Sequence, residues 1–167
     1  MNAQTRGEVK SILVAEILRS WGSLQLRATG TSMLPALWPG DLLSIQSREF
    51  GQVQVGELAL YFREGRFFIH RVAGKSVLGG EPVLITRGDC MTEDDPPVRP
   101  TELLGTVTGI ARDGAYIAPA SGRGRLHLLV ARLLCHWDLL RRLVLRLHAA
   151  RRDAGSRFNF VAGRAAS

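Results

Sequence analysis

The stretch Leu58-Ala59-Leu60-Tyr61-Phe62-Arg63-Glu64-Gly65-Arg66-Phe67-Phe68-Ile69-His70-Arg71-Val72 decides the fold. Its two apolar and aromatic runs, 58–63 and 66–72, have the length and the residue types of β-strands. The stretch that joins them, Arg63-Glu64-Gly65-Arg66, has the composition of a tight turn, since glycine is the residue most often required there. The stretch therefore predicts an antiparallel hairpin.

Further short β-like runs lie on both sides of this hairpin, separated by Gly, Pro or Asp. They are 24–28, 42–46, 83–86 and 103–111. Many short strands joined by tight turns predict a mainly β fold, a small curled antiparallel β domain over 24–118. Before it, residues 1–7 read as a loose tail and 8–21 as a helix that ends at Gly22, together forming an N-terminal region over 1–23.

The sequence pattern changes after the β domain. Residues 119–125 form a Gly- and Arg-rich linker, and apolar residues then recur with a 3.6-residue period over 126–150. This period predicts one long amphipathic helix. Residues 151–167 are basic and rich in Gly and Ala, a composition that favours a disordered tail.

The composition narrows the class of protein. A chain of 167 residues suits one domain with appendages, and its net charge of +7 is concentrated in the C-terminal third. Cys90 and Cys135 lie far apart without metal-ligand spacing, so we expect two free thiols in a reducing compartment. No signal peptide and no transmembrane segment is apparent. We therefore expect a cytoplasmic protein, either free or peripheral at the inner face of the membrane.

A candidate nucleophile lies in the stretch Gly30-Thr31-Ser32-Met33-Leu34-Pro35, which is followed by Gly40-Asp41. A serine needs an adjacent base to remove its proton. The two lysines, Lys10 and Lys75, lie in the predicted N-terminal helix and in a predicted turn, so neither suits this role. His70 is the only histidine in the β domain, and strand alternation puts it on one face with Phe68 and Val72.

A carboxylate that orients His70 must come from elsewhere in the chain. The loop 88–97 holds four acidic residues: Asp89, Glu93, Asp94 and Asp95. Such a cluster is ordinarily solvated surface, and the residues alone do not select one of the four.

Five boxes occur in order: Gly30-x-Ser32-Met33-x-Pro35-x-Leu37-x-x-Gly40-Asp41, Val55-Gly56-Glu57-Leu58-Ala59, His70-Arg71-Val72, Thr86-Arg87-Gly88-Asp89 and Leu104-Gly105-x-Val107. Together they resemble the signal-peptidase-like serine proteases, the S24/S26 group, over about residues 26–111. Most bacterial members have Lys-Arg at the third box. His70-Arg71 is instead similar to the archaeal and endoplasmic-reticulum type, which uses histidine.

This resemblance implies a Ser-His-Asp site formed by Ser32, His70 and Asp95, with no metal or cofactor. It implies supporting roles for Asp89 and Asp94. Many members carry a serine two residues before the nucleophile, where this chain has Gly30, so Thr31 or the Ser32 backbone N–H would bind the oxyanion. The implied activity is that of a serine endopeptidase that cleaves polypeptides after small residues.

Two alternatives remain open. The first is a LexA-type self-cleaving regulator, for which the bond Ala162-Gly163 is a candidate cleavage site. The second is a non-catalytic module that keeps the fold and binds a partner.

Several roles are open for the predicted basic helix 126–150. It suits packing against the β domain or a protein partner, or a peripheral position on an anionic membrane. Nucleic-acid binding is not favoured, because no known nucleic-acid-binding motif accompanies the basic residues.

Overall fold

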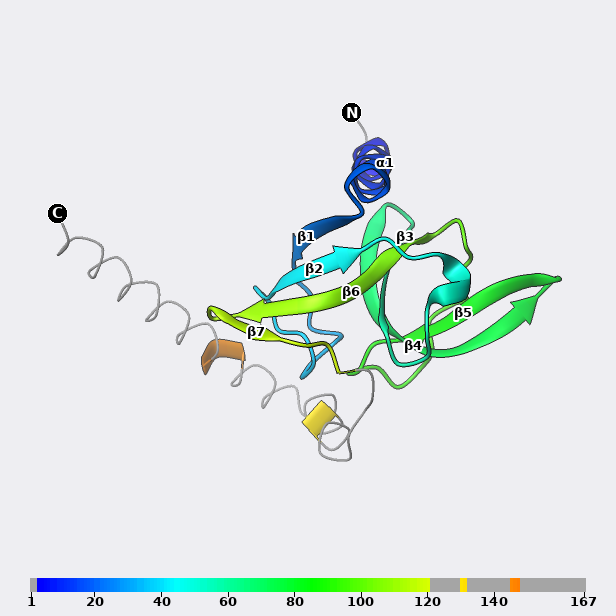
Figure 1. The fold of residues 1–167 in the computed structure, drawn as a ribbon. Coiled ribbons are helices and arrows are strands. Elements are labelled where there is room, and N and C mark those ends of the chain that lie inside the picture. The colour runs from blue at the N-terminus through cyan, green and yellow to red at the C-terminus, as the bar shows by residue number, and fades with distance from the viewer. Residues whose placement is uncertain (1–2, 121–129, 132–144, 148–167) are drawn as a thin grey trace.

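The computed structural model describes residues 3–120 together with the short stretches 130–131 and 145–147 (Figure 1). A helix and seven strands form the described part. They are α1 (Ala3–Trp21), β1 (Ser23–Arg27), β2 (Leu42–Gln46), β3 (Leu58–Arg63), β4 (Arg66–Leu78), β5 (Glu81–Arg87), β6 (Leu103–Arg112) and β7 (Ala115–Ile117), with a short 3-10 helix at Phe50–Gln52. The prediction of a mainly β fold is confirmed.

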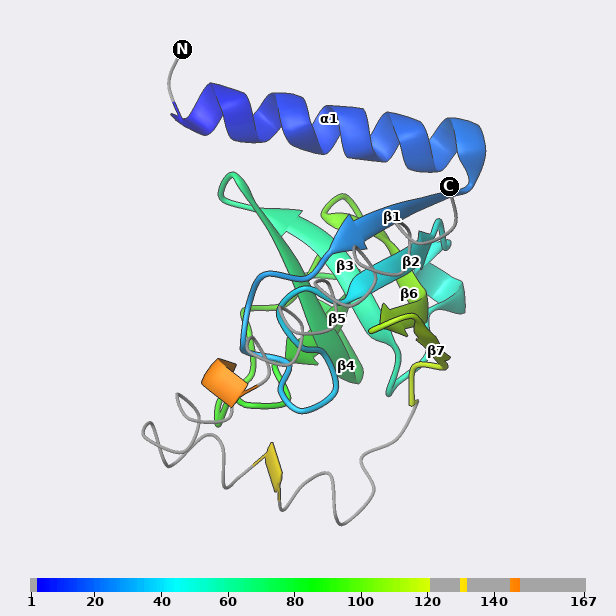
Figure 2. The same cartoon turned by 90° about the vertical axis from the view of Figure 1, so that its left-hand side faces the viewer.

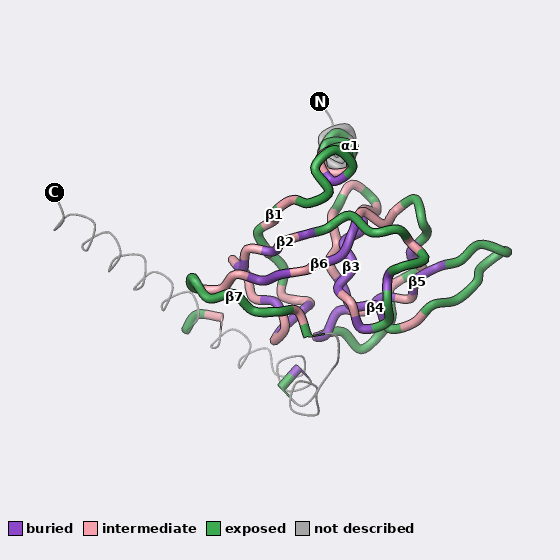
Figure 3. The backbone as a smooth tube through the Cα atoms, in the orientation of Figure 1, coloured by how far each residue is buried: buried purple, intermediate pink, exposed green. Residues whose placement is uncertain are grey.

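The strands form one antiparallel sheet in the order β1-β2-β6-β3-β4-β5, and β7 adds to β6. The predicted hairpin is present with Tyr61 opposite Phe68. Its turn residues Glu64 and Gly65 both have positive φ, at 50° and 78°, as a tight two-residue hairpin turn requires. The β4–β5 hairpin is longer than predicted and projects from the body, where its tip is exposed (Figures 1 and 3).

Helix α1 crosses one end of the sheet and packs against β1 and β6 (Figure 2). It begins at Ala3, so the prediction of a loose tail is wrong for residues 3–7. The helix buries Leu18, whereas Val9, Ile12 and Leu13 are exposed. Several of the apolar residues of this helix are therefore solvent-facing.

The core lies on both faces of β3, whose first four residues are all buried. Leu58 and Leu60 belong to a cluster that includes Leu18 of α1. Ala59 and Tyr61 belong to a second cluster on the opposite face. This continuous apolar strand, buried on both faces, separates the two halves of the site described below.

Several predictions concern residues beyond the described ranges. Of the predicted helix 126–150, only 130–131 and 145–147 are described, and both stretches are helical. The rest of that helix, residues 121–125 of the linker and the tail 151–167 lie outside the described residues. Within the described part of the chain, no helix has the length and hydrophobicity needed to cross a bilayer.

Candidate active site

Ser32 lies on a turn between β1 and β2 that Asp41 holds in place. One carboxylate oxygen of Asp41 accepts a hydrogen bond from the Trp38 backbone N–H at 2.8 Å. Arg112 at the end of β6 donates to both oxygens of Asp41, at 2.9 and 2.7 Å, and also to the carbonyl of Ala36. The Gly40-Asp41 pair therefore serves to fix the turn that carries the serine.

The turn brings Ser32 into contact with His70. The Ser32 Oγ lies 2.9 Å from His70 Nε2, although the two residues are 38 positions apart in the sequence. His70 Nδ1 lies 2.7 Å from Asp95 Oδ2. The His70 side chain is 8% exposed and that of Asp95 is 15% exposed, so this chain of contacts is largely shielded from solvent. Ser32, His70 and Asp95 thus form one continuous hydrogen-bonded line.

Asp95 reaches His70 because the loop after β5 folds back along that strand. The Asp95 backbone N–H donates to the Thr86 carbonyl at 2.8 Å, and Leu84 pairs with Val98 further along. Arg63 of β3 clamps the same loop. Its guanidinium binds Glu102 at 2.6 and 2.7 Å and donates at 2.8 Å to each of two carbonyls, those of Pro96 and Pro97. The loop that carries Asp95 is therefore held by backbone hydrogen bonds to β5 and by the guanidinium of Arg63.

Two residues that the sequence did not indicate also contact this carboxylate. Thr86 Oγ1 donates to Asp95 Oδ2 at 2.8 Å, and the Tyr61 hydroxyl donates to the same oxygen at 3.1 Å. Tyr61 is 1% exposed. Thr86 belongs to a quoted box, but Tyr61 has the sequence signature of an ordinary core aromatic residue, so no signal in the sequence distinguished it.

These contacts determine the charge state of Asp95. Burial raises the pKa of its carboxyl, but hydrogen bonds from His70, Thr86 and Tyr61 outweigh burial and hold the pKa below its usual value. Because the pKa is lower in the folded state, ionised Asp95 stabilises the fold above about pH 4, the ordinary aspartate value, and this stabilisation is lost as the pH falls through the lowered pKa. Burial, offset in part by Thr86, raises the pKa of Tyr61, so its hydroxyl remains a donor.

The loop 88–90 packs directly against the nucleophile. The Cys90 backbone N–H donates to the Ser32 carbonyl at 2.8 Å. A Cβ atom at Gly88 would lie 2.8 Å from the Ser32 carbonyl oxygen, 3.2 Å from Ser32 Cβ and 2.6 Å from Met91 Cγ. Glycine is therefore required at this position by the close approach of two loops.

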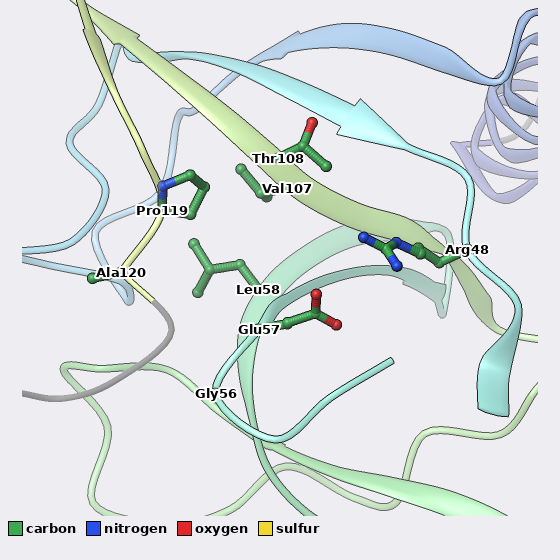
Figure 4. A pocket seen from close by; sticks show the side chains of 8 residues that line it. All are labelled: Arg48, Gly56, Glu57, Leu58, Val107, Thr108, Pro119 and Ala120. Carbon is green, nitrogen blue, oxygen red and sulfur yellow. The ribbon is translucent and has the colours of Figure 1, made fainter. Parts of the chain in front are cut away.

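Arg71, the neighbour of His70 on β4, anchors this loop through Asp89. It donates to both carboxylate oxygens of Asp89, at 2.9 and 2.8 Å, and the two side chains are 5% and 0% exposed. Its remaining nitrogen donates to the carbonyls of Gly56 and Ala120. Gly56 and Ala120 line a small cavity of about 210 Å³ beside β6 (Figure 4). Asp89 thus pairs with the residue that follows His70 on β4.

The other predicted supporting residues lie apart from the Ser-His-Asp line. Asp94 is half-exposed and pairs with Arg87 at 3.5 Å. Thr31 contributes its carbonyl, which accepts from the Leu34 N–H, and it is not among the residues that line the groove described next. The expectation of two free thiols is wrong, because Cys90 is disulfide-bonded. The other cysteine, Cys135, lies outside the described residues. The cysteines therefore no longer support the expectation of a reducing compartment.

A groove of about 650 Å³ opens beside Ser32 and His70. Its walls come from the end of β1, the serine turn and the first residues of β4, and its floor includes the buried side chains of Met33, Leu43 and Leu60. Among the strands that the structure describes, residues 66–70 of β4 pair with β3 on one side only, since the register with β5 starts at Arg71. Ser32 thus faces a largely apolar channel bordered by a strand edge that no other described strand covers.

In comparisons with known proteins, no protein-family model and no curated protein matches this sequence.

Proposed function

We propose that this protein is a serine endopeptidase of the signal-peptidase-like type, with Ser32 as nucleophile, His70 as general base and Asp95 as the group that orients the base. The observation that carries the proposal is the line of contacts from Ser32 Oγ to His70 Nε2 at 2.9 Å and from His70 Nδ1 to Asp95 Oδ2 at 2.7 Å. Nucleophile, base and orienting carboxylate in this geometry are the three parts that acyl transfer requires.

The geometry supports the following division of roles. His70 Nε2 accepts the Ser32 proton as Oγ attacks the peptide carbonyl, and the imidazolium then gives that proton to the leaving amine. Asp95 accepts a hydrogen bond from Nδ1–H. This keeps the proton on Nδ1, so Nε2 is free to act as the base. Among the described residues, the Ser32 backbone N–H has no hydrogen-bond partner, which leaves it available to the oxyanion. Water then hydrolyses the acyl-enzyme by the same route.

The groove supports a polypeptide substrate. An extended peptide can add to the edge of β4 that borders it through backbone hydrogen bonds while its side chains enter the apolar channel. The preference for small residues next to the cleaved bond comes from the resemblance to signal peptidases. A Cβ at Gly30 would meet nothing within 4 Å, so there is room for the hydroxyl side chain that many of those proteases carry there.

The experiment that tests the proposal is digestion of a peptide with an Ala-x-Ala segment, followed by mass spectrometry. The purified chain should cut the peptide after the second alanine, and the Ser32→Ala variant, prepared in the same way, should leave it intact. Equal cleavage by both preparations would refute the assignment. Absence of cleavage of this peptide and of a randomised peptide library by the wild-type chain would also refute it.

Replacing Gly88 by alanine should lower kcat by about 100-fold, because the new methyl group displaces the Ser32 backbone and a misplacement of about 1 Å has an effect of this size. Gly74→Ala is the matched control, since a Cβ there meets nothing within 4 Å and its φ is ordinary. Peptide cleavage at saturating substrate measures both variants. Wild-type kcat in a folded Gly88→Ala variant would contradict the close approach.

A further inference from the structure

A single oxygen of Asp95 receives three hydrogen bonds. Its donors are His70 Nδ1 at 2.7 Å, Thr86 Oγ1 at 2.8 Å and the Tyr61 hydroxyl at 3.1 Å. A carboxylate oxygen offers two lone pairs, so three donors occupy it fully. The imidazole therefore shares this acceptor with two hydroxyl groups, neither of which the proposed reaction uses.

Tyr61 reaches this position because its ring is fixed by packing. The ring stacks on Phe68 with centroids 5.4 Å apart, and it lies in the apolar cluster that includes Val72 and Leu84. Its hydroxyl lies 3.4 Å from His70 Nδ1 and 3.4 Å from Thr86 Oγ1. A buried polar group in such surroundings is costly unless it is paired, so the pairing with Asp95 is a built contact.

We propose that Tyr61 is a positioning residue of the base: with Thr86, its hydroxyl fixes the Asp95 oxygen that accepts the hydrogen bond from His70 Nδ1–H and limits the negative charge that His70 experiences. The proposal rests on the proposed peptidase function. Each hydroxyl donor withdraws part of the carboxylate charge. Without Tyr61 the carboxylate exerts more of its negative charge on the imidazole, so the pH dependence of cleavage should change.

The other charged groups around this pair are themselves partnered. Arg63 lies over the Tyr61 ring at 5.5 Å and is bound to Glu102. Asp94 pairs with Arg87 on β5, and Arg71, adjacent to His70 on β4, pairs with Asp89. Replacing Tyr61 by phenylalanine keeps the ring and all these ion pairs, so it changes only the hydroxyl.

The test is the Tyr61→Phe variant, assayed for peptide cleavage across pH. We expect kcat to fall by about 10- to 100-fold with little change in KM, the size of effect that one hydrogen bond to a charged group produces. The acidic limb of the kcat/KM profile should move to higher pH by about half a unit. Thr86→Val should act in the same direction, and Thr86→Ser, which keeps the hydroxyl, should restore the wild-type profile.

Tyr116→Phe is the matched control, because within the described residues the Tyr116 hydroxyl donates to the Thr108 carbonyl alone and this exposed residue lies on β7. It should leave the profile unchanged. An unshifted acidic limb in Tyr61→Phe, or a change in KM alone, would overturn the positioning role.

A second measurement does not depend on activity. Carbon-13 NMR titration of the Asp95 carboxyl should give a higher pKa in Tyr61→Phe and in Thr86→Val than in the wild-type chain. If the chain cleaves no peptide but this shift appears, the peptidase function fails and the positioning contact stands. If the chain cleaves peptides and neither the titration nor the profile moves, the positioning role fails alone.

Discussion

Replacing Asp95 by asparagine is expected to lower kcat for peptide cleavage by about 10⁴-fold, the magnitude found when a triad loses its orienting carboxylate. His70 Nδ1 lies 2.7 Å from Asp95 Oδ2. An amide NH₂ at that point would face Nδ1 as a donor, and the imidazole would then carry its proton on Nε2. In that tautomer His70 cannot accept the Ser32 proton. The change is nearly isosteric, so KM should change little.

Asp94→Asn supplies the control for this experiment. Asp94 is adjacent in sequence but half-exposed, and its partner is Arg87 at 3.5 Å. Exposed ion pairs contribute little, so this variant should keep wild-type kcat and stability. A loss of less than tenfold in Asp95→Asn, or equal losses in both variants, would remove Asp95 from the site.

Arg71→Met is expected to destabilise the fold by about 3–5 kcal/mol, the cost of leaving one partner of a buried ion pair without its counter-charge. Asp89 would remain 0% exposed with its two guanidinium bonds lost. The carbonyls of Gly56 and Ala120 would lose a donor as well. Urea unfolding followed by circular dichroism measures the loss as a lower midpoint.

The double variant Arg71→Met/Asp89→Leu distinguishes a lost charge partner from lost packing. Removing both charges should recover most of the stability, since apolar replacement of a buried pair is often neutral. Arg19→Met, which breaks the exposed pair with Glu16, should leave the urea midpoint unchanged. If Arg71→Met behaves like Arg19→Met, the buried pair does not hold the loop that packs on Ser32.

The parts of the fold that the sequence predicted well are those with local signals. The runs 42–46 and 58–63 agree with β2 and β3, because apolar residues and turn glycines define them directly. The outer part of β4, residues 73–78, and the first two residues of β5, 81–82, were missed, since they are mostly exposed and have no alternation that burial would impose. Strand β7 is three exposed residues long and offers no pattern at all.

The candidate site also divides into residues that local sequence signals indicated and residues that they did not. Ser32 and His70 could be selected because a serine needs a base and the β domain holds one histidine. Asp95 was singled out only by the resemblance, since its approach depends on a loop that folds back along β5. Tyr61 was not found because its hydroxyl matters only once that loop is in place. Tertiary contacts, not local patterns, decide these roles.

The two buried faces of β3 have a consequence for engineering. Leu60 lines the groove beside Ser32, whereas the hydroxyl of Tyr61 contacts Asp95 on the other face of the strand. In the proposed peptidase, variants at Leu60 should therefore alter substrate range, and variants at Tyr61 should alter the pH profile. Leu60 can be varied while the Tyr61 hydroxyl keeps its contact with Asp95.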